Sequence, residues 1–293
     1  MSETHPVGID PVERFEFGAN WRRFLSVVDE ARIQSATDSL QRALKVSHLK
    51  GKRFLDAGAG SGLFSLAARR LGASVHSFDY DRQAVLCIQE LRRRHYPEDQ
   101  DWRIDQGSVL DPAFLKNLGT FDIVYSWGVL HHTGQMYGAL GNIDRNVAEG
   151  GRLFIAIYND QGMRSRAWTR IKLAYVRSPE FIRWGILGLC SLPLIGRPTL
   201  ASLARGKFPH FLFGSPKGRG MSFWTDLVDW VGGYPFEVAK PEEIFEFFHL
   251  RGYALEFLKT SAGGHSCNEF IFRKCQIKNP LTNGGETHRL GLP

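Results

Sequence analysis

The feature that most constrains the fold is a regular alternation of short apolar runs and amphipathic segments between residues 53 and 159. In the amphipathic segments, apolar residues recur at spacings of three and four, which is the period of a helix. The expected strands cover 53–58, 74–80, 102–108, 121–127 and 151–159, and the expected helices cover 62–72, 81–96, 111–118 and 136–148. Alternating units of this length predict an α/β fold, a parallel sheet with helices on both faces.

The segments on either side of this alternation divide the chain further. After Asn159 the alternation stops for about eighty residues, and it resumes with an expected helix at 240–252. Two β-rich runs follow, at 253–260 and 268–274, and they suit antiparallel edge strands of an otherwise parallel sheet. The predicted units are an N-terminal helical extension (1–49), a core (50–159), a mainly helical lid insertion (160–239), the completion of the core sheet (240–275) and a flexible tail (276–293).

The turn after the first expected strand, FLDAGAGSG (54–62), is rich in glycine. Gly58, Gly60 and Gly62 allow a tight turn and a close approach of the backbone to a ligand, and the next helix offers free N–H groups. The dinucleotide-binding spacing G-x-G-x-x-G is not met, because position 63 is Leu. Asp56, just before the glycines, would repel a pyrophosphate but can hold an ammonium group.

A second carboxylate narrows the class of ligand. Asp79 ends the second expected strand, where an acidic side chain accepts hydrogen bonds from both hydroxyls of a ribose. The next acidic residue, Asp81, is expected to cap the following helix. A ligand with an amino-acid end, a ribose and no diphosphate fits this pattern, and S-adenosylmethionine has these parts.

The chain resembles the class I S-adenosylmethionine-dependent methyltransferases. The resemblance rests on FLDAGAGSG, FDYD (78–81), QGSV (106–109), FDIVYSWGVLHH (121–132) and EGGRLFIAIYN (149–159). It implies a Rossmann-like, seven-stranded, mostly parallel sheet with an antiparallel last strand, and S-adenosylmethionine as the cofactor. The implied cofactor-binding residues are Asp56, Gly58, Gly60 and Gly62 at the methionine end, Asp79 and Tyr80 near the ribose, Gly107 and Ser108 beside the adenine, and Ser126 and Trp127 at the end of the fourth strand.

Two of these positions leave alternatives open. Many members of the resembled family have an aspartate where Ser108 stands, so this chain departs from the family pattern at the adenine. Trp127 suits either stacking on the adenine or filling the core beneath it.

Two adjacent histidines, His131 and His132, follow the fourth expected strand. They reach the sheet edge where ligands of this fold bind. No nearby cluster of Cys, His or Asp completes a coordination sphere, so no metal site is predicted. A neutral imidazole is suited to take a proton from a methyl acceptor near pH 7.

The resemblance assigns different roles to the two histidines. In small-molecule methyltransferases with L-[EH]-H after the fourth strand, the second residue of the pair faces the substrate. By that match His132 is the candidate base and His131 its neighbour on the cofactor side. The alternative is that both rings cap the next helix or hydrogen-bond the sheet rim. Tyr158, at the end of the fifth strand, is a further catalytic candidate that we expect to face the pocket.

Positive charge is concentrated in the insertion. The whole chain carries a net charge of +7, whereas residues 160–220 hold eleven Lys and Arg against two acidic residues. This basic and aromatic segment suits an anionic or amphipathic substrate, peripheral contact with an anionic membrane through 160–220, or RNA, and it also suits a solvated helical face. Nucleic acid is the least favoured partner, because no RNA-binding module accompanies the fold.

The cysteines, the N-terminus and the apolar segments indicate the cellular location of the protein. The four cysteines form no CxxC pair, and the N-terminus lacks the basic start and apolar core of a signal peptide. The most apolar run, 184–196, contains Pro193 and is shorter than the roughly 20 residues of a membrane-spanning helix. We therefore expect a cytoplasmic protein, and the sequence does not fix its oligomeric state.

The sequence thus predicts methyl transfer from S-adenosylmethionine to O, N or C of a small, anionic or amphipathic metabolite. The alternatives are an RNA or protein methyltransferase, and a non-catalytic protein that binds S-adenosylmethionine.

Overall fold

The structure is a computed structural model that describes residues 28–204, 223–262 and 266–275, together with Phe15 and Leu25. The predicted tail (276–293) and His265 lie outside the described residues, as do most of the first 27 residues and 205–222 of the insertion.

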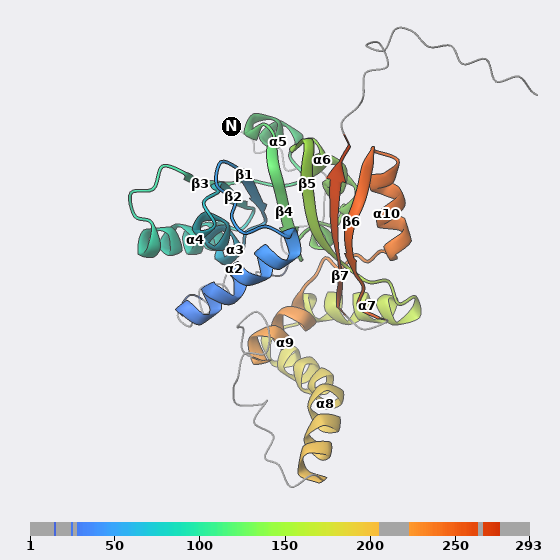
Figure 1. Ribbon diagram of the computed structural model, residues 1–293. Coiled ribbons are helices and arrows are strands. Elements are labelled where there is room, and N and C mark those ends of the chain that lie inside the picture. The colour runs from blue at the N-terminus through green and yellow to red at the C-terminus, as the bar shows by residue number, and fades with distance from the viewer. Residues whose placement is uncertain (1–14, 16–24, 26–27, 205–222, 263–265, 276–293) are drawn as a thin grey trace, which may run out of the picture.

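A seven-stranded sheet forms the centre of the molecule, with the order β3-β2-β1-β4-β5-β7-β6 (Figure 1). The first five strands of this order pair in parallel, and β7 is antiparallel to both β5 and β6. The predicted Rossmann-like sheet with an antiparallel last strand is therefore confirmed. The strands are β1 (Arg53–Ala57), β2 (Ser74–Asp79), β3 (Trp102–Gln106), β4 (Phe121–Trp127), β5 (Val147–Tyr158), β6 (Tyr253–Lys259) and β7 (Cys267–Lys274).

Helices cover both faces of the sheet. Alternate residues of each strand point to opposite faces, and apolar residues on both faces need a covering layer. Phe54 of β1 belongs to the core under the first group of helices, and its neighbour Leu55 belongs to the core under the second. The first group is α2 (Glu30–Leu44), α3 (Leu63–Arg70) and α4 (Arg82–His95), and the second is α5 (Pro112–Leu118), α6 (Met136–Asp144) and α10 (Pro241–His249).

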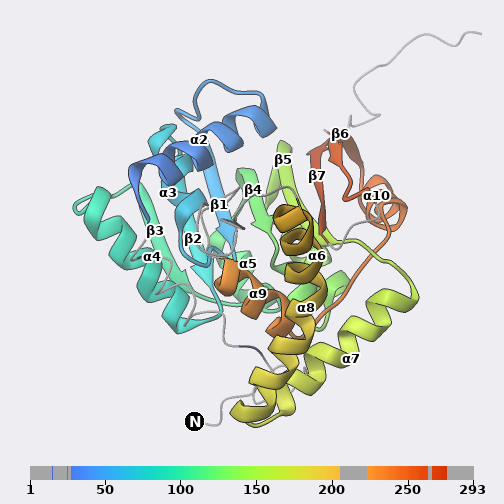
Figure 2. The same ribbon diagram turned by 90° about the horizontal axis from the view of Figure 1, so that it is seen from below.

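Three further helices lie below the sheet in Figure 1, at the edge where the parallel strands end. They pack on one another around Tyr175, Leu187 and Val231, which form a small core of their own. Viewed from that side, they lie in front of the sheet edge (Figure 2). They are α7 (Met163–Arg177), α8 (Glu180–Ala204) and α9 (Phe223–Gly232).

The helix expected over 136–148 is too long, and the fifth strand begins earlier than expected. The helix ends at Asp144, and β5 starts at Val147, which pairs with Phe121 of β4. The pairing shifts register before it resumes at Arg152, because the chain turns through Gly150 at φ 73°. Strand pairing therefore overrides the helical spacing of residues 145–148.

The helix-capping prediction at Asp81 is confirmed, since its side chain accepts the N–H of Gln83. Pro193 does not end α8, which runs on to Ala204. Within the part of the chain that the structure describes, no helix is both long and apolar enough to cross a membrane.

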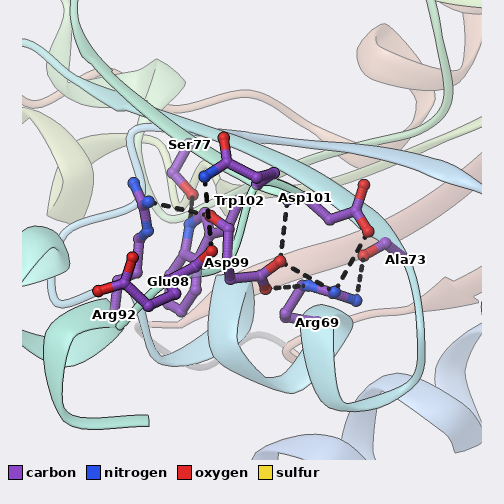
Figure 3. Close-up of polar contacts among 9 residues, drawn as sticks. Arg69, Ala73, Ser77, Arg92, Glu98, Asp99, Asp101 and Trp102 are labelled. Carbon is purple, nitrogen blue, oxygen red and sulfur yellow. Dashed lines mark hydrogen bonds and ion pairs between the residues drawn. The ribbon is translucent and has the colours of Figure 1, made fainter. Parts of the chain in front are cut away.

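A charged cluster joins α3 to the loop between α4 and β3 (Figure 3). Arg69 donates to the carboxylate of Asp99 from two guanidinium nitrogens, and this carboxylate also accepts the N–H of Asp101 at 2.9 Å. Arg92 donates to the backbone carbonyl of Asp99 at 2.9 Å. Asp99 is thus held from three sides, with only 10% of its side chain exposed.

We expect Asp99→Ala to lower the free energy of unfolding by about 1.5–3 kcal/mol, because it leaves the partly buried Arg69 without its main partner. Asp101→Ala is the matched control, since Asp101 is 64% exposed and lies 3.4 Å from Arg69. Its expected cost is within about 0.5 kcal/mol. Urea unfolding measures both, and equal losses in the two variants would contradict the assignment.

Candidate functional site at the sheet edge

The glycine-rich turn after β1 is bound to the end of β2. The N–H groups of Gly58 and Ala59 both donate to the carbonyl of Phe78, at 2.9 and 3.1 Å. Gly58, Gly60 and Gly62 have φ angles of 75°, 57° and 80°, which L-residues with side chains rarely adopt. A Cβ atom at Gly58 would lie only 2.3 Å from Val129 Cγ1. The turn is therefore a close-packed backbone cradle, as the sequence predicts.

Asp79 connects three parts of this edge. Its carboxylate accepts the N–H of Gly60 and the N–H of Asp81, each at 2.9 Å. Its carbonyl accepts the N–H of Gly107 at 3.0 Å. The structure thus brings together the glycine turn, the end of β2 and the end of β3. The predicted contact of Asp79 with ribose hydroxyls stays a prediction.

The other predicted cofactor residues lie around this junction. Tyr80 is half exposed next to Asp79. A Cβ atom at Gly107 would lie 2.2 Å from the ring of Phe114, so any other residue there would displace this ring. The hydroxyl of Ser108 accepts the N–H of Leu110 at 3.1 Å and shapes the turn that follows.

Ser126 and Trp127 lie deeper at the end of β4. Ser126 is fully buried, and its hydroxyl donates to the carbonyl of Ala57 at 2.9 Å, which connects β4 to β1. Trp127 is partly buried and packs against the core under α2 and α3. Their contacts with a cofactor stay predictions.

Asp56 is buried beneath the turn. Its carboxylate accepts the hydroxyl of Ser65 on α3 at 2.5 Å. Ser65 in turn accepts from Ser77 at 2.7 Å, and Ser77 accepts the indole N–H of Trp102 at 2.9 Å. Burial raises the pKa of Asp56 to about 7; the hydrogen bond from Ser65 opposes this, and the charge of Asp79 adds to it.

Sequence reasoning missed this chain of hydrogen bonds. The signal for it is two serines at positions of α3 and β2 whose neighbours form the apolar core. The predicted contact of Asp56 with an ammonium group stays a prediction.

The two histidines form a short 3₁₀ turn, Leu130–His132, after β4. His131 is fully buried, and its ring lies 4.1 Å from that of Tyr158, between centroids. Burial lowers the pKa of His131 well below its usual range, and the nearby charges of His132 and Lys172 lower it further. His131 is therefore neutral at pH 7. The ring of His132 lies 5.6 Å from that of Tyr158, so all three predicted catalytic residues are together.

Residues 235–239, which we call the return segment, hold this turn from outside. The Nδ1 atom of His132 lies 2.6 Å from the carbonyl oxygen of Pro235. The N–H of Glu237 donates to the carbonyl of His131 at 2.9 Å. Its carboxylate accepts the N–H of Met136 at 3.1 Å. No local sequence pattern indicates this support, because the return segment is about a hundred residues away along the chain.

A small cavity continues from Tyr158 towards α7 and α9. Its lining includes Asn159, Lys172, Trp230 and Phe236. Lys172 is fully buried, donates to the carbonyl of Trp230 and lies 4.7 Å from the ring centroid of Phe236. Over the described ranges, no group of three or more His, Cys, Asp or Glu is placed to hold a metal ion.

The sequence model of the methyltransferase domain family matches residues 28–238, which is more than half of the chain. The chain belongs to this family. It is a class I methyltransferase, and S-adenosylmethionine is its cofactor. The positive-φ glycine turn and the carboxylate of Asp79 lie together at the sheet edge, as a site for that cofactor requires. Their contacts with its methionine end and its ribose stay predictions.

Relatives of this methyltransferase include enzymes of quinone synthesis. The ubiquinone biosynthesis O-methyltransferase of Methylocella silvestris is 29% identical over 193 residues, which are 59% of this chain and 73% of that protein. The mitochondrial ubiquinone biosynthesis O-methyltransferase of Schizosaccharomyces pombe is 29% identical over 167 residues, 53% of this chain and 57% of that protein.

Solved structures share the fold. The magnesium protoporphyrin IX methyltransferase of Synechocystis PCC 6803 has a TM-score of 0.53 and 12% identity, and the alignment covers 92% of this chain and 100% of that one. A methyltransferase of Anabaena variabilis has a TM-score of 0.52 and 9% identity, covering 94% and 99%.

We expect Asp79→Asn to weaken S-adenosylmethionine binding by roughly tenfold or more, because a charge-assisted acceptor for the ribose is lost. Asp81→Asn is the matched control: it keeps a helix-capping side chain two residues further on, and its expected affinity is that of the wild type. Isothermal calorimetry with S-adenosylmethionine and with its demethylated product measures both. An Asp79→Asn variant that binds normally would contradict the ribose assignment.

Asp56 generates a pH-dependent prediction. Because its folded pKa lies above the ordinary value of 3.8, ionising it costs stability. The stability it contributes is present below about pH 4 and is lost as the pH rises through about 7. We expect the wild type to lose roughly 1–3 kcal/mol between pH 5 and 8 relative to Asp56→Asn. Urea unfolding at several pH values tests this prediction. If the free energies of unfolding of the wild type and Asp56→Asn change with pH in the same way, the prediction is wrong.

Proposed function

We propose that this methyltransferase transfers the methyl group of S-adenosylmethionine to an oxygen of a small molecule, with His132 as the general base. The observation that carries the proposal is the 2.6 Å contact between His132 Nδ1 and the carbonyl oxygen of Pro235. A carbonyl only accepts, so Nδ1 carries the hydrogen. In the neutral ring the lone pair is then on Nε2, which is the atom that takes the proton of an acceptor hydroxyl.

Oxygen is the proposed acceptor atom because the similar proteins are named as O-methyltransferases. The proteins 29% identical to this chain are O-methyltransferases of ubiquinone biosynthesis by name. A hydroxyl must lose its proton as the new bond to carbon forms, and a positioned base accelerates such a step by about 10²–10⁴-fold. His131 stays neutral in its buried position, so it adds no competing positive charge next to the sulfonium.

The side chains around the cavity beside Tyr158 favour an anionic or amphipathic acceptor. The cavity itself, at about 10 Å³, has room for about one water molecule, so binding an acceptor requires it to widen. The rings of Tyr158, Trp168, Trp230 and Phe236 line it, and the ammonium group of Lys172 supplies a buried positive charge. Aromatic rings suit the apolar part of such a molecule, and an ammonium group suits an acidic part. Residues 160–239 then act as the lid over the core of residues 50–159, as the sequence predicts.

Catalysis in this proposal is mainly positioning. The return segment fixes the tautomer and the direction of the His132 ring, and the glycine cradle fixes the methyl donor. The acceptor oxygen must lie about 3–3.5 Å from the methyl carbon, in a site from which water is excluded. The chemistry supplied by S-adenosylmethionine is a methyl group on a positively charged sulfur.

We expect His132→Ala and His132→Gln to lower kcat by about 10²–10⁴-fold while the affinity for S-adenosylmethionine stays within about twofold. The acceptor is first found by incubating the enzyme with isotopically labelled S-adenosylmethionine and fractionated cell extract, followed by mass spectrometry of the labelled product. Exposed His249 on α10 supplies the control variant His249→Gln, with unchanged turnover. Normal turnover in both His132 variants would exclude the base, and a labelled nitrogen or carbon would exclude O-methylation.

A further inference from the structure

Helix α8 exposes large apolar side chains along one side. Phe181 is 75% exposed, Trp184 66%, Leu189 70% and Leu192 64%. With about 3.6 residues per turn, these four positions fall on the same side of the helix. Gly185 and Gly188 open onto this side as well, since a Cβ atom at either would meet no protein atom within 4 Å. This outer face is therefore apolar and uncovered.

The outer face is not the side by which α8 packs on the protein. Leu187 and Cys190 lie on the opposite side of the helix and are buried with Tyr175 of α7 and Leu227 of α9. The helix thus already has a buried apolar side, and folding does not account for the second one. Exposed apolar patches of this kind mark surfaces that contact another apolar phase or partner.

Positive charge is exposed on α7, the helix that packs with α8. Helix α7 exposes Arg164, Arg166, Arg170 and Arg177, and it contains no acidic residue. Met163, at the start of α7, is 75% exposed. Both helices face the viewer in Figure 2, on the side of the molecule that the ends of the parallel strands point to.

We propose that the outer faces of α7 and α8 dock on the surface of an anionic lipid bilayer. Aromatic and aliphatic side chains of α8 enter the boundary between headgroups and acyl chains, and the arginines of α7 contact lipid phosphates. The positive charge of α7 favours a bilayer over a second copy of this chain as the partner of this surface. A facing copy would find no carboxylate on α7 to pair with its own arginines, whereas an anionic bilayer complements them.

This proposal is independent of the acceptor and of the role of His132. It concerns the outer faces of α7 and α8, whereas the cavity beside Tyr158 is lined by residues of α7 and α9.

Co-sedimentation of the full-length protein with vesicles tests the proposal. The vesicles are phosphatidylcholine alone, and phosphatidylcholine with about one-third phosphatidylglycerol. We expect binding to the anionic vesicles that weakens as salt rises. The variants Phe181→Ser/Trp184→Ser and Arg166→Glu/Arg170→Glu should each lower the partition coefficient by roughly tenfold or more. Leu250→Ser, which changes a 76% exposed leucine after α10, is the control and should sediment like the wild type.

The readouts separate this proposal from the proposed function. Calorimetry should give wild-type affinity for S-adenosylmethionine in all three variants, which shows that they are folded and that the cofactor site is unchanged. Wild-type protein that stays in solution with anionic vesicles overturns the proposal, as does undiminished sedimentation of the variants. A wild-type dimer on size exclusion that Phe181→Ser/Trp184→Ser dissociates also overturns it, because the face then belongs to a second copy.

Discussion

Backbone hydrogen bonds between neighbouring strand ends hold the whole functional edge of the sheet. The loop after β1 donates from Gly58 to Phe78 at the end of β2, and the loop after β3 donates from Gly107 to Asp79. The return segment donates from Ala239 to Tyr158 at the end of β5. Parallel strands leave such carbonyls unpaired where the ladder ends, and an unpaired buried carbonyl is costly. The loops that satisfy these groups are the same loops in which we predict the cofactor contacts and propose the acceptor site.

This constraint explains why glycine and acidic side chains concentrate at the edge. A loop that must turn back onto the next strand within a few residues needs positive φ angles, and Gly58, Gly60 and Gly62 supply them. The N–H groups that such a turn exposes need acceptors, and Asp79 takes those of Gly60 and Asp81. The carboxylate that we expect to bind the ribose therefore also organises the turn beside it, so fold and site depend on the same atoms.

The sequence predicted the fold and the cofactor well, because both rest on local patterns. Strand and helix periodicity gave the α/β sheet, and the glycine turn with Asp79 gave the cofactor class. The pattern failed where distant contacts decide the structure. Residues 145–148 have helical spacing, yet Val147 joins β5 because Phe121 offers it a partner. The burial of Asp56 likewise depends on Ser65 and Ser77, whose positions follow only from the packing of α3 on β2.

The chemistry of the histidine pair shows the same limit. In the sequence, only the family resemblance distinguishes His132 from His131, since both imidazoles follow β4. Their difference comes from the return segment: Pro235 fixes the tautomer of His132, whereas His131 is enclosed beneath Tyr158 and kept neutral by burial. The return segment enters directly from α9, which packs on α7 and α8. The contacts that distinguish His132 from His131 therefore come from a segment that is distant in sequence, which is why the local pattern could not provide them.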